Sequence, residues 1–299
     1  MGKADSPKEK LKMKAMFFTS NLYNDTSNSN LKGCSATDYV FTPMQDFRSI
    51  TDEDAKKMAM SIKSLLAVRE GKTTNIWIGT PSVNDKNAWL NYTADQLLAF
   101  VENVYAELDS YQNKVAGVYM NQEAIYGDMD YNNVLGGTQI ANKQIRIMKQ
   151  IRDKVKTGIV HGTQFLWCPY YGRGDDAATI IKKLGHVADK VQIFDYVLLQ
   201  PNTIFHNSSA TNGNLDGVKH SVNRNKVCYR NDVYVIASKV SNTAIGYVME
   251  YVPGNSVFDD YKTAFASCKN KPWMFYWQHS ANPNIDGLSS AVTEINNWC

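Results

Sequence analysis

The sequence predicts a single (β/α)8 barrel, the TIM-barrel architecture, over residues 14–299. Short apolar segments alternate with amphipathic segments of helical period along almost the whole chain, and such alternation is typical of a parallel sheet. The predicted strands are apolar on both faces, which indicates a sheet covered on both sides. Eight such units within 299 residues fit a barrel, which usually takes about 250 residues plus insertions.

Proline, glycine and capping residues divide the chain into these elements. Pro43, Pro81 and Pro201 each stop an apolar strand pattern, because proline lacks the N–H that a strand ladder needs. Thr51 opens a helix as a capping box with Asp54, and Thr93 caps the next helix. Strands are expected at residues 15–20, 39–42, 75–79, within 115–127, and at 165–170, 195–200, 245–251 and 273–278. Helices are expected at residues 51–71, 93–108, 138–155, 175–189, 218–225, 257–268 and 289–298, whereas a loop or short helix follows the first strand.

An open, doubly wound sheet is the main alternative fold. It would normally carry a glycine-rich GxGxxG turn after the first strand, but residues 17–22 contain no glycine. No composition shift, repeat or low-complexity linker divides the chain, which indicates one domain. Residues 1–13 are polar and rich in lysine, as in a solvated, disordered tail.

In a (β/α)8 barrel the active site lies at the C-terminal ends of the strands. Two glutamates occupy such positions: Glu123 follows the fourth predicted strand and Glu250 ends the seventh. Strand side chains alternate with a period of two, so an inward Glu123 implies that Asn121 and Tyr119 also point inward. The remaining strand ends are rich in aromatic and amide side chains, namely Tyr23, Gln45, Tyr170, Tyr171, Gln200, Asn202, Trp277 and Gln278.

This combination of residues suits glycoside hydrolysis. Cleavage of a glycosidic bond needs one carboxylic acid to protonate the leaving oxygen and a second carboxylate to attack or to activate water. A water-poor aromatic pocket raises the pKa of the acid, as its task requires. Aromatic rings can stack on the apolar faces of sugars, and amides can bind the hydroxyl groups. We therefore expect a poly- or oligosaccharide substrate and hydrolysis that uses two carboxylates.

The order of these residues resembles the clan A (4/7) superfamily of retaining (β/α)8 glycoside hydrolases. The resemblance implies that Glu123 is the acid/base, that Glu250 is the nucleophile and that Trp277 is a sugar platform. The segments MNQEAIYG, FLWCPYYG and NLDGV are also similar to bacterial secreted proteins containing domain of unknown function 4855, a resemblance over nearly the whole chain. The sequence departs from the superfamily at one position: Asn usually precedes the acid/base directly, whereas here Gln122 intervenes.

Further substrate-binding candidates come from the same strand ends. Asn121, Tyr170, Tyr171 and Gln200 are expected to contact the sugar, and Asp46 with Arg48 either belongs to the site or forms a solvated loop. Two alternatives stay open. One is a carbohydrate-binding barrel without catalysis, and the other is an inverting hydrolase that uses a different acid, such as Asp25 or Asp46.

Composition and motifs disfavour several other classes. The net charge is +3, with 32 basic and 29 acidic residues and no basic face typical of nucleic-acid binding. No apolar run approaches the ~20 residues that span a bilayer. The five histidines are scattered, the five cysteines lack metal-type spacing, and no GxSxG motif is present. We expect neither metal nor cofactor, no membrane or nucleic-acid partner, and a monomer. An extracellular location is expected from the reaction class and the resemblance, although no signal peptide is present.

Overall fold

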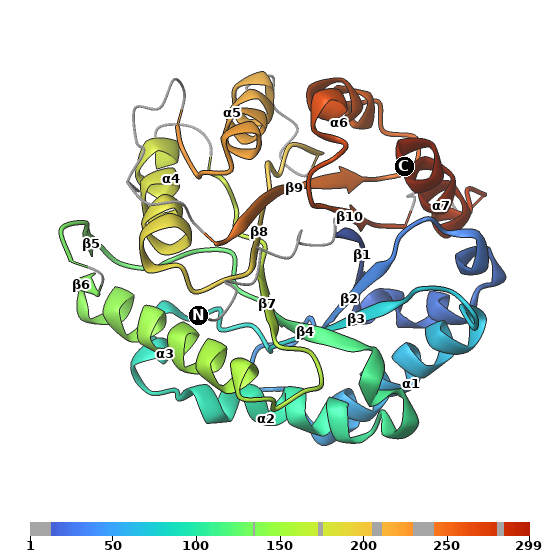
Figure 1. The fold of residues 1–299 in the computed structure, drawn as a ribbon, viewed down its shortest axis with the longest axis horizontal. Coiled ribbons are helices and arrows are strands. Elements are labelled where there is room, and N and C mark those ends of the chain that lie inside the picture. Colours follow the sequence, from blue (N-terminus) through green and yellow to red (C-terminus); the bar gives the residue numbers. More distant parts are fainter. Residues whose placement is uncertain (1–12, 134, 173–175, 205–210, 230–241, 280–283) are drawn as a thin grey trace, which may run out of the picture.

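The computed structural model describes residues 13–299 except 134, 173–175, 205–210, 230–241 and 280–283. Its centre is a closed barrel of eight parallel strands in the order β1-β10-β9-β8-β7-β4-β3-β2 (Figure 1), which confirms the predicted fold. The strands are β1 (Lys14–Thr19), β2 (Asp38–Thr42), β3 (Asn75–Gly79), β4 (Val115–Met120), β7 (Gln164–Trp167), β8 (Tyr196–Leu199), β9 (Ala244–Tyr251) and β10 (Trp273–Trp277). A small antiparallel pair, β5 (Met129–Asp130) and β6 (Gly136–Gly137), lies after β4. The predicted tail lies outside the described residues, apart from Met13.

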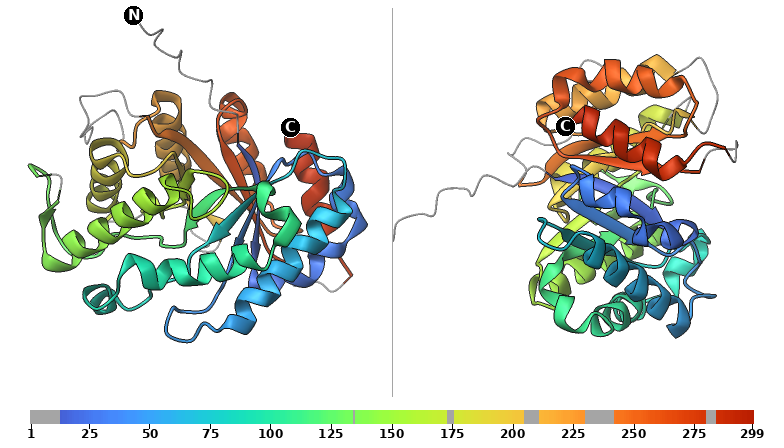
Figure 2. Two further views of the ribbon diagram at one scale, coloured as in Figure 1. Left: turned by 60° about the horizontal axis from the view of Figure 1, so that its bottom comes forward. Right: turned by 90° about the vertical axis from the view of Figure 1, so that its right-hand side faces the viewer.

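Helices surround the barrel on its outer side (Figures 1 and 2). They are α1 (Asp52–Val68), α2 (Ala94–Ala106), α3 (Gln139–Lys156), α4 (Ala177–Gly185), α5 (Thr211–Arg224), α6 (Val257–Phe265) and α7 (Gly287–Trp298). The capping boxes at Thr51 and Thr93 are both formed. In place of a helix after β1 there are two 3-10 helices, Ser20–Ser27 and Ser29–Gly33. None of the described helices combines the length and the apolar character needed to cross a membrane.

Three predicted boundaries differ from the structure. The fifth strand of the barrel ends at Trp167 and not at residue 170, because Pro169 cannot donate to the ladder. Beyond Trp167, Tyr170 forms an isolated parallel β-bridge with Gln200. The helix expected at 175–189 is α4 followed by a π-helical turn, His186–Val191, and α5 begins earlier than expected, at Thr211.

Side chains on the barrel strands separate into two layers. One layer fills the barrel interior and includes Phe17, Trp77, Tyr119 and Met274. The other packs outward against the helices and includes Val118, Met120, Phe275 and Trp277. This separation is the two-residue period of a strand, and it confirms that Tyr119 points inward and Val118 outward.

Arg69, at the C-terminal end of α1, secures the irregular segment between β1 and β2. Its guanidinium is only 4% exposed and donates to the carbonyls of Leu31 at 2.6 Å, Cys34 at 3.0 Å and Ala36 at 3.0 Å. It also lies 4.8 Å from the centre of the Tyr39 ring. The guanidinium thus holds together three backbone carbonyls of the segment that leads from the second 3-10 helix into β2.

We expect Arg69→Met to lower the free energy of unfolding by about 3 kcal/mol, because three hydrogen bonds from a buried guanidinium to backbone carbonyls are lost at about 1 kcal/mol or more each. Chemical denaturation at neutral pH measures the change. The matched control is Arg152→Met, since Arg152 is half-exposed and forms only a 3.5 Å ion pair with Asp153. The control should change stability by less than about 0.5 kcal/mol. Equal losses in the two variants would contradict the role of Arg69.

Candidate active site

A cavity of about 370 Å³ opens at the C-terminal end of the barrel, where the fold places active sites. Its wall is formed by residues that follow β2, β3, β4, β7 and β8, and its floor by side chains from inside the barrel. The lining residues are Phe17, Thr19, Thr42, Pro43, Met44, Ser82, Asn84, Tyr119, Asn121, Gln122, Glu123, Ala124, Tyr126, Tyr170, Gln200, Met274 and Tyr276.

Three aromatic rings form the floor of the cavity. Phe17 packs edge-on against Tyr119, with ring centres 5.5 Å apart, and its ring centre is 5.2 Å from that of Tyr276. All three residues occupy inward positions of their strands. The floor of the cavity is therefore largely aromatic.

Glu123 lies in the cavity wall, three residues beyond the end of β4. The Gln200 side-chain amide donates to its Oε1 at 3.3 Å, and the Tyr170 N–H donates to its backbone carbonyl at 3.0 Å. The carboxylate is open to solvent on the cavity side, while protein atoms surround it elsewhere. This partial burial raises the pKa of Glu123. A raised pKa favours the protonated carboxyl group, which can donate its proton.

Glu250 also occupies an inward position, near the end of β9 and in register with Tyr276 on β10. It is 1% exposed and is not a lining residue of the cavity. Its Oε2 accepts hydrogen bonds from the Tyr261 hydroxyl at 2.7 Å and the Ile204 N–H at 3.1 Å. Its Oε1 has no hydrogen-bond partner among the described residues.

The electrostatic environment of Glu250 is that of a buried carboxyl group. Burial is the main cause that raises its pKa to about 7, and the charge of Glu123 raises it further. Hydrogen bonds from Tyr261 and from the Ile204 and Asn202 backbones act in the opposite direction. Asn202 adopts a left-handed backbone conformation, with φ 54°, which is unusual for a residue other than glycine.

Tyr276 connects the two glutamates. It lines the cavity, and its pKa is raised by burial and then by the negative charges of Glu123 and Glu250. The two carboxylates and the phenol thus share one end of the barrel interior. The charge of Glu123 adds to the burial that raises the pKa of Glu250, so an ionised Glu123 favours the protonated form of Glu250.

Three of the predicted substrate-binding residues line the cavity: Asn121, Tyr170 and Gln200. The Asn121 side chain donates to the Pro43 carbonyl at 3.2 Å, which fixes it against the end of β2. Gln122, the residue that separates Asn121 from Glu123, is also a lining residue.

Two other predictions need correction. Trp277 is fully buried, points outward from the barrel and packs edge-on against Phe18 at 6.2 Å, so it cannot serve as a sugar platform. Tyr171 is buried in the same outer layer and donates to the Cys228 carbonyl at 2.6 Å. In the inward–outward alternation along their chain segments, both residues occupy outward positions. Tyr276, which sequence reasoning missed, has the inward parity, and the register of the WMFYW strand could have identified it.

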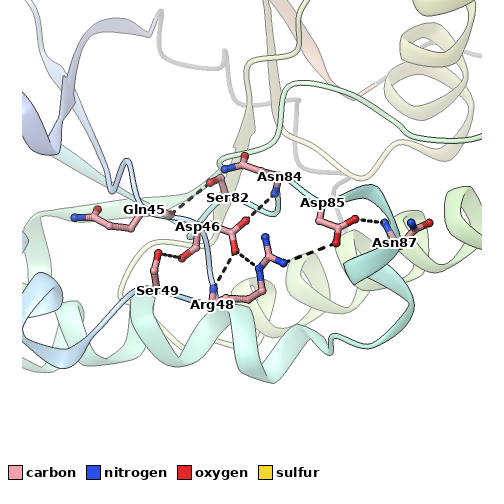
Figure 3. A network of polar contacts seen from close by, with 8 residues as sticks. All are labelled: Gln45, Asp46, Arg48, Ser49, Ser82, Asn84, Asp85 and Asn87. Carbon is pink, nitrogen blue, oxygen red and sulfur yellow. Dashed lines mark hydrogen bonds and ion pairs between the residues drawn. The ribbon is translucent and has the colours of Figure 1, made fainter.

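Asp46 and Arg48 are not lining residues either, but they support the wall (Figure 3). Arg48 Nε lies 2.8 Å from Asp46 Oδ1, and Asp46 Oδ2 accepts from the Asn84 N–H at 2.9 Å. Burial opposes ionisation of Asp46, yet the hydrogen bonds from Asn84 and Arg48 prevail and lower its pKa. The pair therefore joins the loop after β2 to the loop after β3, where Asn84 faces the cavity.

Asp25, the other acid considered at a strand end, lies away from the main cavity lining. Its Oδ2 is 3.2 Å from Nε2 of His279. Within the described ranges, no three His, Cys, Asp or Glu side chains are grouped as a metal site would require.

Comparison with known proteins supports the fold. No family model matches the sequence, and no curated protein matches it. Among solved structures, a GH18 chitinase from Pseudoalteromonas aurantia has a TM-score of 0.55 at 12% identity, covering 96% of this chain and 100% of its own. A protein from Bacteroides thetaiotaomicron, provisionally described as an alpha-L-fucosidase, has a TM-score of 0.55 at 11% identity, covering 100% and 96%.

A third similar structure is a sugar phosphate isomerase/epimerase from Parabacteroides distasonis, with a TM-score of 0.50 at 12% identity, covering 100% of this chain and 97% of its own. These similarities show that the chain shares a barrel fold found in glycoside hydrolases and in an isomerase. At such low identity they carry no residue roles. The resemblance to domain of unknown function 4855 gains no support, since no family model matches.

The pKa of Glu250 leads to a stability prediction. Because it is raised from 4.5 to about 7, the folded protein binds a proton that the unfolded chain releases in this interval. The stabilising contribution of protonated Glu250 is fully present below about pH 4.5 and is lost as pH rises through about 7. The Glu250→Gln variant does not undergo this loss. The free energy of unfolding of the variant, minus that of wild type, should therefore increase by about 3 kcal/mol from about pH 4.5 to 8.

Denaturation curves at the two pH values measure this difference. Glu102→Gln, which removes an exposed carboxylate on α2, controls for the change in net charge. Parallel pH dependences in wild type and Glu250→Gln would show that Glu250 does not titrate as its burial implies.

Proposed function

We propose that this protein is a glycoside hydrolase that cleaves O-glycosidic bonds in a poly- or oligosaccharide by a retaining mechanism. The observation that carries the proposal is the placement of Glu123 in the wall of an aromatic-floored cavity, with Glu250 on the inner face of the same barrel end. Such a substrate suggests an extracellular location, and a monomer is sufficient because both glutamates come from one chain.

Glu123 is the general acid and base in this mechanism. Its protonated form donates to the glycosidic oxygen while that oxygen leaves, and its ionised form then takes a proton from the attacking water. The raised pKa of Glu123 supports the first role, and its exposure to the cavity supports access for water in the second. Gln200 holds the carboxylate from the side of β8.

Glu250 is the nucleophile, which bonds to the anomeric carbon and is released by water in the second step. Tyr261 and Ile204 both bind Oε2, so they orient the carboxylate and leave Oε1 as the attacking atom. Since Glu250 has almost no exposed surface, the sugar must displace neighbouring side chains to reach it. Side-chain rearrangements of this kind are common on binding.

We expect Glu123→Gln and Glu250→Gln each to reduce hydrolysis by at least about 10²-fold while the circular dichroism spectrum stays unchanged. Release of reducing sugar from a panel of oligosaccharides measures the loss. The control Glu102→Gln removes a carboxylate of the same kind from the surface of α2 and should keep full activity. Full activity in either site variant would exclude that residue from catalysis. Wild-type binding without cleavage would favour a carbohydrate-binding barrel.

The stereochemistry of the first-formed product distinguishes the two hydrolytic mechanisms. A covalent intermediate on Glu250 requires that the new hemiacetal keep the anomeric configuration of the substrate, whereas direct attack by water inverts it. Proton NMR during the first minutes of hydrolysis detects the anomer before mutarotation. An inverted product would show that water attacks the anomeric carbon directly. A carboxylate would then act as general base, and Glu250 would not be the nucleophile.

A further inference from the structure

A second cavity adjoins the first at the C-terminal end of the barrel. It measures about 260 Å³ and lies over the segments that follow β1 and β10. The two cavities share Thr19, Met44 and Tyr276 as lining residues, so they lie side by side, and together they are called the cleft. The second cavity adds Asn21, Leu22, Gln278 and His279.

The charges along this cleft are sparse. Glu123 is the one carboxylate among the lining residues, and neither cavity has a lysine or arginine among them. Two basic side chains described near the cleft are paired: Arg48 with Asp46 and Asp85, and His279 with Asp25 at 3.2 Å. An anionic sugar would lose hydration without gaining a cation from the described lining residues.

The junction of the two cavities carries an apolar side chain that the fold does not bury. Met44 is 53% exposed, one of three large hydrophobic side chains described as exposed, and it lines both cavities together with Tyr276. Its backbone N–H is fixed by the Ser20 hydroxyl at 3.3 Å. A methionine and a tyrosine at this point provide an apolar contact for a sugar ring, and the amides of Asn21 and Gln278 lie within the second cavity to bind hydroxyl groups.

We infer that the ligand is a neutral oligosaccharide of at least two sugar units, with one unit beside Glu123 and a neighbouring unit in the second cavity. The inference rests on the proposed function for the position of the reacting bond. It adds the substrate class. Glycans with uronate or sulfate groups carry negative charges, and the described lining residues of the cleft include no lysine or arginine to pair with them. It also makes Met44 and Asn21 determinants of oligosaccharide affinity.

The test uses the full chain carrying Glu123→Gln, which should bind without cleaving. Isothermal titration calorimetry compares cellotetraose, xylotetraose, mannotetraose and chitotetraose with tetragalacturonate. At least one neutral tetrasaccharide should bind, and tetragalacturonate should bind at least tenfold more weakly than that sugar. Adding Met44→Ala should weaken the neutral tetrasaccharide about tenfold, and adding Asn21→Ala should weaken it severalfold. Met60→Ala is the matched control, because Met60 is 67% exposed on α1 and lines neither cavity.

The outcomes separate this inference from the proposed function. Binding of a neutral tetrasaccharide that depends on Met44, without any release of sugar by wild type, would support the inference and refute hydrolysis. Cleavage of tetragalacturonate that depends on Glu123 would support hydrolysis and overturn the inference. Absence of binding to every neutral tetrasaccharide, or equal losses in Met44→Ala and Met60→Ala, would also overturn it.

Discussion

Each strand of a closed parallel barrel directs alternate side chains to the interior and to the surrounding helices, and most features of this protein depend on that constraint. Asn121, Tyr170, Gln200 and Glu250 have the inward parity, and each of them is found at the C-terminal end of the interior or in its cavity wall. Neighbours such as Met120, Tyr171, Leu199 and Met249 pack in the outer layer instead. A shift of one residue in any strand would exchange the two layers, so the site and the hydrophobic core are determined together.

The same constraint gives the site its electrostatic character. Because aromatic side chains fill the interior below the cavity, ionisable groups at its upper end are partly removed from water. The pKa of Glu123 and that of Glu250 are both raised for this reason, and Tyr276 stands where it senses both charges. The cavity wall is held in a different way. Exposed polar contacts, above all those of Asp46 with Arg48 and Asn84, join adjacent loops (Figure 3).

Together these features describe a cleft suited to a neutral polar ligand with apolar faces. The floor and the junction at Met44 offer apolar contact, the walls offer amides and hydroxyl groups, and one accessible carboxylate provides acid–base chemistry. Glu250 is held by Tyr261 and the Ile204 backbone just outside this cleft. Its burial favours the protonated form, so the proposed mechanism requires that a bound sugar change the surroundings of Glu250 before it acts as the nucleophile.

The sequence by itself determined the fold and the positions of Glu123 and Glu250 at strand ends, because both follow from local patterns. Periodicity, proline stops and capping boxes are properties of neighbouring residues. In a closed parallel barrel, the C-terminal ends of all strands lie at the same end of the barrel. Only the tertiary structure decided which strand-end side chains reach the cavity. Trp277 and Tyr276 are adjacent in sequence and similar in type, and the register within β10 alone sends one outward and the other inward. The burial of Glu250 depends on contacts between distant segments, such as that of Ile204 with Glu250. The two adjoining cavities bring together residues as distant in sequence as Thr19 and Tyr276, and no local pattern encodes this arrangement.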